Sequence, residues 1–224
     1  MKKLRIIVLF LCLLPVIIGF SQSSLKFSQD SVQIFVPDSI VNSDTTANTP
    51  IHRYQQTISD KEVWKSVGVT QLYNLTMSSI LLAMPEEVSK WPAETKLYWP
   101  RIKNQYINSF TKPPVFDNDL FFINYIGHPY QGAFYYNSLR SKGATIAQSA
   151  IFNFSQILLW EYVWEGGMEQ PSIQDLITTP ILGSVLGELA HRATIELRKK
   201  VFFWYEKVLV TVINPSYVIN NGYK

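Results

Sequence analysis

A group of ionisable side chains lies between Gly127 and Arg192, in a stretch that is otherwise rich in apolar and aromatic residues. Charged groups are costly to bury unless they are paired or hydrogen-bonded. These residues therefore either satisfy one another in a buried network or form a site with acid, base or ligand roles. The candidate catalytic residues are His128, Arg140, Glu161, Glu165, Asp175, Glu188, His191 and Arg192.

Glu161 and Glu165 stand four residues apart, so on a helix the two like charges share one face and repel each other. We expect Arg140 and Arg192 to neutralise them, because a guanidinium group forms bidentate pairs with carboxylates. The preferred interpretation is a buried network, with Glu188 and His191, that fixes how the helices dock. The alternative uses the same carboxylates as acid and base in a pocket.

Glu188 precedes His191 by three residues and Arg192 by four, so one side of a helix carries all three side chains. Glu-x-x-His is half of the motif of di-iron helical bundles, but the sequence contains no second copy. A salt bridge from Glu188 to Arg192 explains these residues without a metal. We therefore predict no cofactor, and the alternative is one divalent metal bound by His128, Glu188 and His191.

Gly183 and Gly187, followed by Ala190 and Thr194, leave one helical face small enough for another backbone to approach closely. The preferred interpretation is tight packing within the chain. A homodimer seam through Gly183 and Gly187 is the alternative.

The N-terminal segment has the pattern of a secretory signal peptide, because Lys2, Lys3 and Arg5 precede an unbroken apolar run. Its removal leaves 17 of the 20 basic residues, equal to the 17 acidic ones, so we expect no nucleic-acid partner. Cys12, the only cysteine, lies in that run, which excludes disulfides and cysteine-ligated metals from the processed chain.

We predict a signal peptide over 1–21, a flexible polar spacer over 22–58, a helical domain over 59–215 and a tail over 216–224.

Capping and breaking residues divide the remainder into helices, apart from one alternating segment at 31–36 that suits a short strand. A capping box at Ser59–Glu62 opens a helix that Pro85 ends. Further expected helices cover 117–126, 130–140 and 145–165, with an extended residue before Pro129 and a glycine turn at 143. A cap at Ser172 precedes the last helix, which runs from Pro180 to about residue 212. The predicted fold class is all-α, a single compact bundle of about five or six helices.

Two runs of residues, 67–84 and 143–160, contain no charged side chain. Such a run is typical of a fully buried core helix or of a helix seated in a membrane. The Gln, Asn, Thr and Ser residues in the first run favour the core helix, whereas the tryptophans that flank both runs favour a membrane-associated domain.

Five short motifs follow one another between Asp117 and Asn214. They are His128-Pro129-Tyr130-Gln131-Gly132, Tyr135-Tyr136-Asn137 to Arg140, Trp160-Glu161-Tyr162 to Glu165, Pro171-Ser172 to Asp175-Leu176-Ile177, and Gly183 to Gly187-Glu188. In this combination the chain resembles a bacterial family, the domain of unknown function 3943. The resemblance implies an exported, envelope-associated protein. It implies no known activity, so it assigns no catalytic residue.

These observations predict an exported protein of the periplasm or of the periplasmic face of the outer membrane. The first hypothesis is a non-enzymatic structural or docking module whose partner is the membrane or an outer-membrane protein. The alternative is a metal-dependent or acid/base hydrolase-like enzyme that acts on an envelope lipid or glycan.

Overall fold

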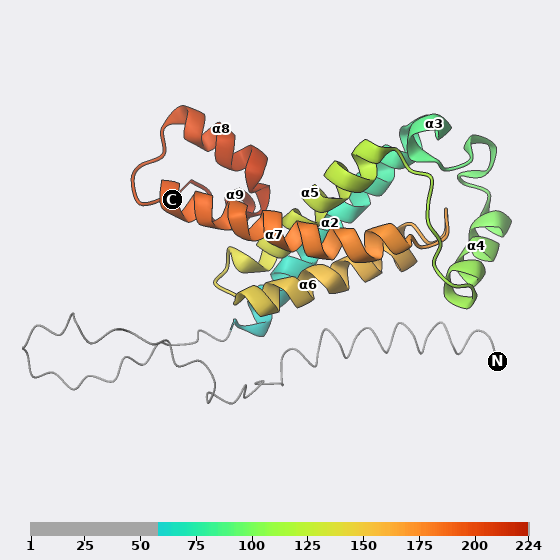
Figure 1. Cartoon of the computed structure of the whole chain (residues 1–224), viewed down its shortest axis with the longest axis horizontal. Helices are drawn as coiled ribbons and strands as arrows, with labels where there is room; N and C mark the ends of the chain where they lie inside the picture. Colours follow the sequence, from blue (N-terminus) through green and yellow to red (C-terminus); the bar gives the residue numbers. More distant parts are fainter. Residues whose placement is uncertain (1–57, 224) are drawn as a thin grey trace, which may run out of the picture. The chain divides into compact units, whose positions relative to one another are not determined.

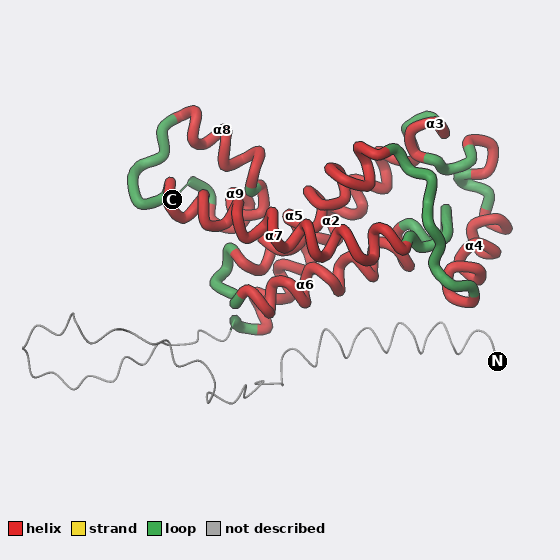
Figure 2. The backbone as a smooth tube through the Cα atoms, in the orientation of Figure 1, coloured by secondary structure: helices red, strands yellow, loops and turns green. Residues whose placement is uncertain are grey.

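The computed structural model describes residues 58–223, which contain eight α-helices and no β-strand (Figures 1 and 2). This confirms the all-α class, with more helices than the five or six expected. The predicted signal peptide, spacer, strand at 31–36 and Cys12 lie outside the described residues. The elements are α2 (Asp60–Ala83), α3 (Glu86–Ser89), a 3-10 turn η2 (Ala93–Thr95), α4 (Trp99–Thr111), a π-helical turn η3 (Ile123–Gly127), α5 (His128–Arg140), α6 (Ile146–Leu159), a second π-helical turn η4 (Trp160–Trp164), α7 (Ile173–Leu197), α8 (Trp204–Ile213) and α9 (Pro215–Asn221).

Helices α5 and α7 approach so closely that their contact requires glycine. A Cβ atom on Gly183 would lie 2.6 Å from the Cα of Gly132, and one on Gly132 would lie 2.5 Å from the carbonyl oxygen of Thr179. Further along, Asn137 Nδ2 donates to the Gly187 carbonyl at 3.0 Å, so the two helices run parallel. The chain itself therefore fills the Gly183–Gly187 face, which confirms packing within the chain, and a homodimer seam there would have to displace α5.

Helix α6 runs alongside α7 (Figure 1), and the two are joined by polar contacts. Asn153 of α6 donates from Nδ2 to the Pro180 carbonyl at 3.2 Å and to Ser184 Oγ at 3.0 Å. Helix α2 binds α5 in the same way, since Ser66 Oγ donates to the Ser138 carbonyl at 2.7 Å. Hydrogen bonds between small polar side chains and their neighbours thus join the central helices.

The predicted start of α2 is confirmed, but the predicted capping box is wrong. Ser59 occupies the N-cap position without a capping hydrogen bond from its side chain. The Glu62 carboxylate instead pairs with Lys65 at 2.8 Å and with Lys142 at 3.5 Å, so it does not reach back to the N-cap amide. The end of α2 at Ala83 agrees with the expected effect of Pro85.

The expected break before Pro129 is wrong. His128 has helical angles, φ −64° and ψ −44°, and the turn η3 leads directly into α5. A π-helical turn changes the hydrogen-bond register of a helix, which accommodates the proline ring in the first turn of α5.

The last predicted helix differs from the structure at both ends. Ser172 caps α7, accepting a hydrogen bond at Oγ from the Asp175 amide at 3.1 Å, and Pro180 lies inside the helix. The helix ends at Leu197, well before residue 212, because Phe202 turns inward and packs with α8 and α9 in a small second core.

The C-terminal segment is not an unpatterned tail. Asn214 caps α9, accepting at its side-chain oxygen from the Tyr217 amide at 3.2 Å, and Pro215 fills the first helical position. Tyr217 is fully buried against Phe202 and Val210. The last described residues therefore belong to the folded domain.

In helix α2 the buried side is polar and much of the exposed side is apolar, the reverse of a helix in a water-soluble protein. Its four buried residues are all polar and recur every fourth position: Ser66, Thr70, Asn74 and Ser78. Several of its large apolar residues are exposed instead, and Leu72 is 65% exposed, whereas Val67, Val69 and Tyr73 are partly buried against the core. The interpretation of 67–84 as a fully buried core helix is therefore wrong.

The same reversal is seen in α7, whereas α5 buries aromatic and apolar residues together with polar ones. Glycine and proline aside, the buried residues of the described chain are 24 polar or charged residues and 13 hydrophobic ones. Helix α7 buries Asp175, Thr179 and Thr194 with its glycines, while Ile181 and Leu189 are exposed. None of the described helices combines the length and the hydropathy of a bilayer-crossing segment.

Candidate functional site

The structure divides the eight candidate residues into two groups at different places along α7. Asp175 lies near its start and Glu188 lies 13 residues later, which on an α-helix separates them by about 20 Å. Asp175 is grouped with His128, Glu161 and Glu165, and Glu188 with Arg140, His191 and Arg192. The single network predicted from the sequence is therefore wrong.

The group around Glu188 is a closed ion-pair cluster. The carboxylate of Glu188 accepts from Arg140 Nε at 2.8 Å, from Arg192 Nε at 2.9 Å and from Tyr136 Oη at 2.8 Å. Burial alone would raise the pKa of Glu188, but these hydrogen bonds outweigh it and lower the pKa to about 2. Burial, followed by the charge of Arg140, lowers the pKa of His191 to about 4, so this imidazole is neutral at pH 7.

The two arginines provide a matched test of this cluster. We expect Arg140→Gln to destabilise the fold by about 2 kcal/mol, because a partly buried carboxylate loses charge-assisted hydrogen bonds. Arg192 is 69% exposed in its side chain and sits one helical turn from Glu188, so Arg192→Gln should cost at most about 0.5 kcal/mol. Urea denaturation followed by circular dichroism in one detergent buffer measures both. Equal losses for the two variants would contradict a structural role for the Arg140 pair.

The second group surrounds a small cavity, here called the acidic cavity. Its volume is about 10 Å³, room for about one water molecule. Six carboxyl groups line it together with one amide and one hydroxyl: Asp117, Asp119, Glu161, Glu165, Glu169, Asp175, Gln170 and Ser172.

Ser172, the N-cap of α7, links two of these carboxyl groups. Its hydroxyl donates to Asp117 Oδ2, and its backbone amide donates to Glu161 Oε2 at 2.8 Å. The remaining oxygens are less well satisfied, since Glu161 Oε1, Asp119 Oδ1 and Asp175 Oδ1 are buried without a hydrogen-bond partner. His128, at the start of α5, places Nε2 at 3.7 Å from Asp175 Oδ2.

No described lysine or arginine forms an ion pair with the acidic cavity. Arg140 and Arg192 therefore do not neutralise Glu161 and Glu165, because Glu188 binds both guanidinium groups about 20 Å away. Protons take the place of those cations. Glu165 shares a hydrogen bond with Glu169, which requires a proton on one of the two carboxyl groups.

The pKa values follow from this environment. Burial, and then the neighbouring carboxylates, raise the pKa of Glu161 and of Glu165 well above the usual range. The same causes raise the pKa of Asp175 to about 8 and that of Asp119 to about 7. At pH 7 the carboxyl groups of Glu161, Glu165 and Asp175 are therefore mainly neutral, whereas at Asp117 hydrogen bonds, chiefly from Ser172, outweigh burial and lower the pKa. Burial lowers the pKa of His128 to about 4, so this imidazole is neutral at pH 7.

The proposed metal ligands do not converge. His128 faces Asp175 and Gln131, whereas Glu188 and His191 belong to the ion-pair cluster further along α7. Among residues 58–223, no group of three histidine, aspartate or glutamate side chains has an arrangement suited to a metal ion.

Three carboxyl groups of the acidic cavity, those of Asp117, Asp119 and Glu169, are not among the candidates predicted from the sequence. One signal was available, because Glu161, Glu165 and Glu169 form a series with a spacing of four residues.

Acid–base catalysis requires the reacting group within hydrogen-bond reach of the carboxyl group. The acidic cavity has room for one water molecule and not for a lipid or a sugar.

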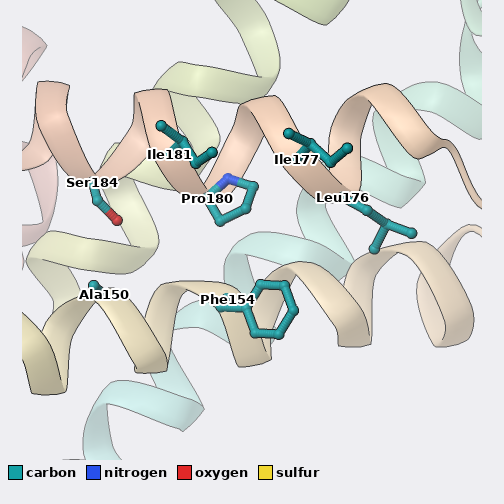
Figure 3. A pocket seen from close by; sticks show the side chains of 7 residues that line it. All are labelled: Ala150, Phe154, Leu176, Ile177, Pro180, Ile181 and Ser184. Carbon is teal, nitrogen blue, oxygen red and sulfur yellow. The ribbon is translucent and has the colours of Figure 1, made fainter.

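A larger hollow lies on the outer surface between α6 and α7 (Figure 3). This groove has a volume of about 520 Å³ and is open to the outside. Six of its seven lining residues are apolar, and the hydroxyl of the seventh, Ser184, already accepts a hydrogen bond from Asn153. The lining residues are Ala150, Phe154, Leu176, Ile177, Pro180, Ile181 and Ser184.

Comparison with known proteins finds one similar family and no known activity. The model of one family, described as Domain of unknown function (DUF3943), matches residues 113–216, a range that contains both the ion-pair cluster and the acidic cavity. No curated protein and no solved structure matches the chain significantly. Residues 113–216 are therefore similar to this domain of unknown function, in agreement with the resemblance of the five motifs.

Proposed function

We propose that this protein is a non-enzymatic, envelope-associated docking module whose helical domain contacts lipid acyl chains through its apolar outer faces. The observation that carries the proposal is the reversed polarity of the domain, with 24 polar or charged and 13 hydrophobic residues buried in the described chain. Water-soluble domains bury mainly apolar side chains. The signal-peptide pattern of residues 1–21 supports export to the periplasm or to the periplasmic face of the outer membrane.

The contacts between the helices support a lipid environment. Where lipid surrounds helices, burial of apolar groups cannot drive their association, so small residues and hydrogen-bonding side chains hold them together. The close contact of Gly132 with Gly183 has this character. So do the hydrogen bonds from Ser66 to α5 and from Asn153 to α7.

The outer faces favour hydrocarbon over a protein partner. They extend over several helices, and examples are Leu72 on α2, Phe154 on α6, Ile181 and Leu189 on α7 and Leu209 on α8. The one polar side chain that lines the groove between α6 and α7, Ser184, is already hydrogen-bonded to Asn153. A surface that is wide and mainly apolar suits acyl chains.

The alternative function is a hydrolase-like enzyme that acts on an envelope lipid or glycan. The raised pKa values of Glu161, Glu165 and Asp175 support it, because perturbed carboxyl groups occur often in active sites. The small volume of the acidic cavity favours the docking module.

Site-specific fluorescence can test lipid contact directly. In full-length chains that carry Cys12→Ser, a single cysteine at Leu72→Cys or Val185→Cys is labelled with an environment-sensitive fluorophore. We expect vesicles with brominated acyl chains to quench both labels, because both positions face outward on apolar faces. A label at Asn104→Cys, on the exposed polar side of α4, is the matched control.

The comparison between positions is independent of the N-terminal apolar run, which is present in all three chains. Equal quenching at all three positions, with iodide in the aqueous phase reaching Leu72→Cys and Val185→Cys as readily as Asn104→Cys, would refute lipid contact. Selective quenching at positions 72 and 185 supports the docking module.

A further inference from the structure

The turn between α7 and α8 combines positive charge with exposed apolar side chains. Arg198, Lys199 and Lys200 follow the end of α7, and all three are exposed. Directly after them, Val201 is 89% exposed and Trp204 is 77% exposed. We call residues 198–207 the basic corner.

The basic corner is held in a defined position. Phe202 is buried with Val210 of α8 and Tyr217 of α9, and Ile195 and Leu197 of α7 pack against them. The neighbours of Phe202 on both sides therefore point outward as a consequence of extended backbone, in which successive side chains alternate. The exposed apolar residues are fixed beside the cations by this small core.

Charge is unevenly distributed over the domain. Residues 192–207 contain five basic residues, Arg192, Arg198, Lys199, Lys200 and Lys207, and two acidic ones, Glu196 and Glu206. The described residues as a whole contain 14 basic and 14 acidic residues, so this segment has a charge of +3 and the rest a charge of −3. The excess of positive charge gathers at one end of α7.

Stabilisation of the helix end explains part of this charge. Cations near a helix C-terminus interact favourably with its dipole, and Lys199 and Lys200 pair with Glu196 at 2.7 Å and Glu206 at 2.9 Å. It does not explain why Val201 and Trp204 are exposed beside them. Tryptophan next to lysine and arginine is typical of the boundary between lipid headgroups and acyl chains.

We infer that the basic corner recognises anionic lipid headgroups, with Arg198, Lys199 and Lys200 at the headgroup phosphates and Val201 and Trp204 in the underlying apolar layer. This inference rests on the proposed lipid contact and adds selectivity for negative charge. Basic residues at an anionic membrane surface each strengthen binding several-fold, and salt weakens the effect.

The test compares vesicles of pure phosphatidylcholine with vesicles that contain phosphatidylglycerol. We expect the full chain to bind the anionic vesicles more tightly, and Arg198→Gln/Lys199→Gln/Lys200→Gln to reduce that preference about 100-fold. A control variant with the same loss of charge, Lys61→Gln/Lys65→Gln/Lys103→Gln, changes exposed lysines elsewhere. It should keep most of the preference.

The outcomes separate the inference from the proposed function. If both triple variants lose the preference equally, or if the chain shows no preference for anionic vesicles, the headgroup inference is wrong. Selective acyl-chain quenching at positions 72 and 185 in phosphatidylcholine would leave lipid contact intact in that case. If that quenching is absent as well, lipid contact fails together with the inference.

Discussion

Raising the pH from 6.5 to 8 is expected to lower the free energy of unfolding by about 1.6 kcal/mol through Asp175 alone. The pKa of Asp175 is raised to about 8 in the folded domain, so its carboxyl group is protonated there at pH 6.5 and half ionised at pH 8. In the unfolded chain the same group is ionised above its usual pKa of about 3.9. The free energy of unfolding therefore falls by about 1.4 kcal/mol per pH unit near pH 6.5, and by about half as much per unit near pH 8.

The sign follows from the direction of the shift. A raised folded-state pKa gives stability that is complete below the unfolded pKa and is lost as the pH rises through the folded value. The groups around Asp175 act in the same direction, because burial also raises the pKa of Glu161 and Glu165 well above the usual range. His128 and His191 act in the opposite direction and more weakly, because they are neutral in the folded domain but about half protonated in the unfolded chain at pH 6.5. Loss of those protons by pH 8 favours the folded domain by about 0.4 kcal/mol for each histidine.

Urea denaturation at pH 6.5, 7.25 and 8 in one detergent measures this dependence. Asp175→Asn should reduce the slope by about one proton, because the amide does not titrate. The control is Glu196→Gln, since Glu196 is 71% exposed in its side chain and pairs only at the surface. A slope that Asp175→Asn leaves unchanged would show that Asp175 is ionised in the folded domain.

Gly183→Ala is expected to destabilise the domain by about 3 kcal/mol. The added Cβ would lie 2.6 Å from the Cα of Gly132, a backbone atom that no change of side-chain rotamer can move away. Helices α5 and α7 would have to separate, which disturbs the hydrogen bond from Asn137 to Gly187. Overpacking of this kind typically costs about 1–3 kcal/mol, and a backbone clash belongs at the upper end.

Gly68→Ala is the matched control, because Gly68 lies inside α2 and a Cβ atom added there would meet no other atom within 4 Å. Alanine at this position should stabilise the domain by about 0.5–1 kcal/mol through its higher helix propensity. Opposite signs for the same substitution at the two positions would confirm the close contact. Stabilisation by Gly183→Ala would mean that α5 and α7 do not meet at these glycines.

Local signals predicted the boundaries that depend on neighbouring residues alone. Pro85 ends α2, Gly143 adopts the left-handed conformation with φ 97° in the turn after α5, and Ser172 caps α7. The end of α7 at Leu197 could not be predicted in this way. It depends on the burial of Phe202 against α9, a contact between distant residues.

The candidate site was predicted in some of its members and not in its arrangement. Glu188 and Arg192 are one helical turn apart, so their pairing could be predicted from spacing and is confirmed at 2.9 Å. The partners of Glu161 could not be predicted from spacing, because they depend on which part of α7 lies beside η4. Asp175 lies there, and the arginines do not.

The reversed polarity of α2 and α7 has a consequence for how the chain reaches its native state. In water, the hydrophobic effect favours early contacts between apolar side chains that are exposed in the folded domain, such as Leu72 and Ile181. The native helix contacts, made by serine, threonine, asparagine and glycine, gain little from that collapse. Folding and aggregation therefore compete for the same side chains in water. An apolar medium that covers those faces before the helices pack prevents this competition. The buried polar residues and glycines of α2 and α7 then determine which helices pair.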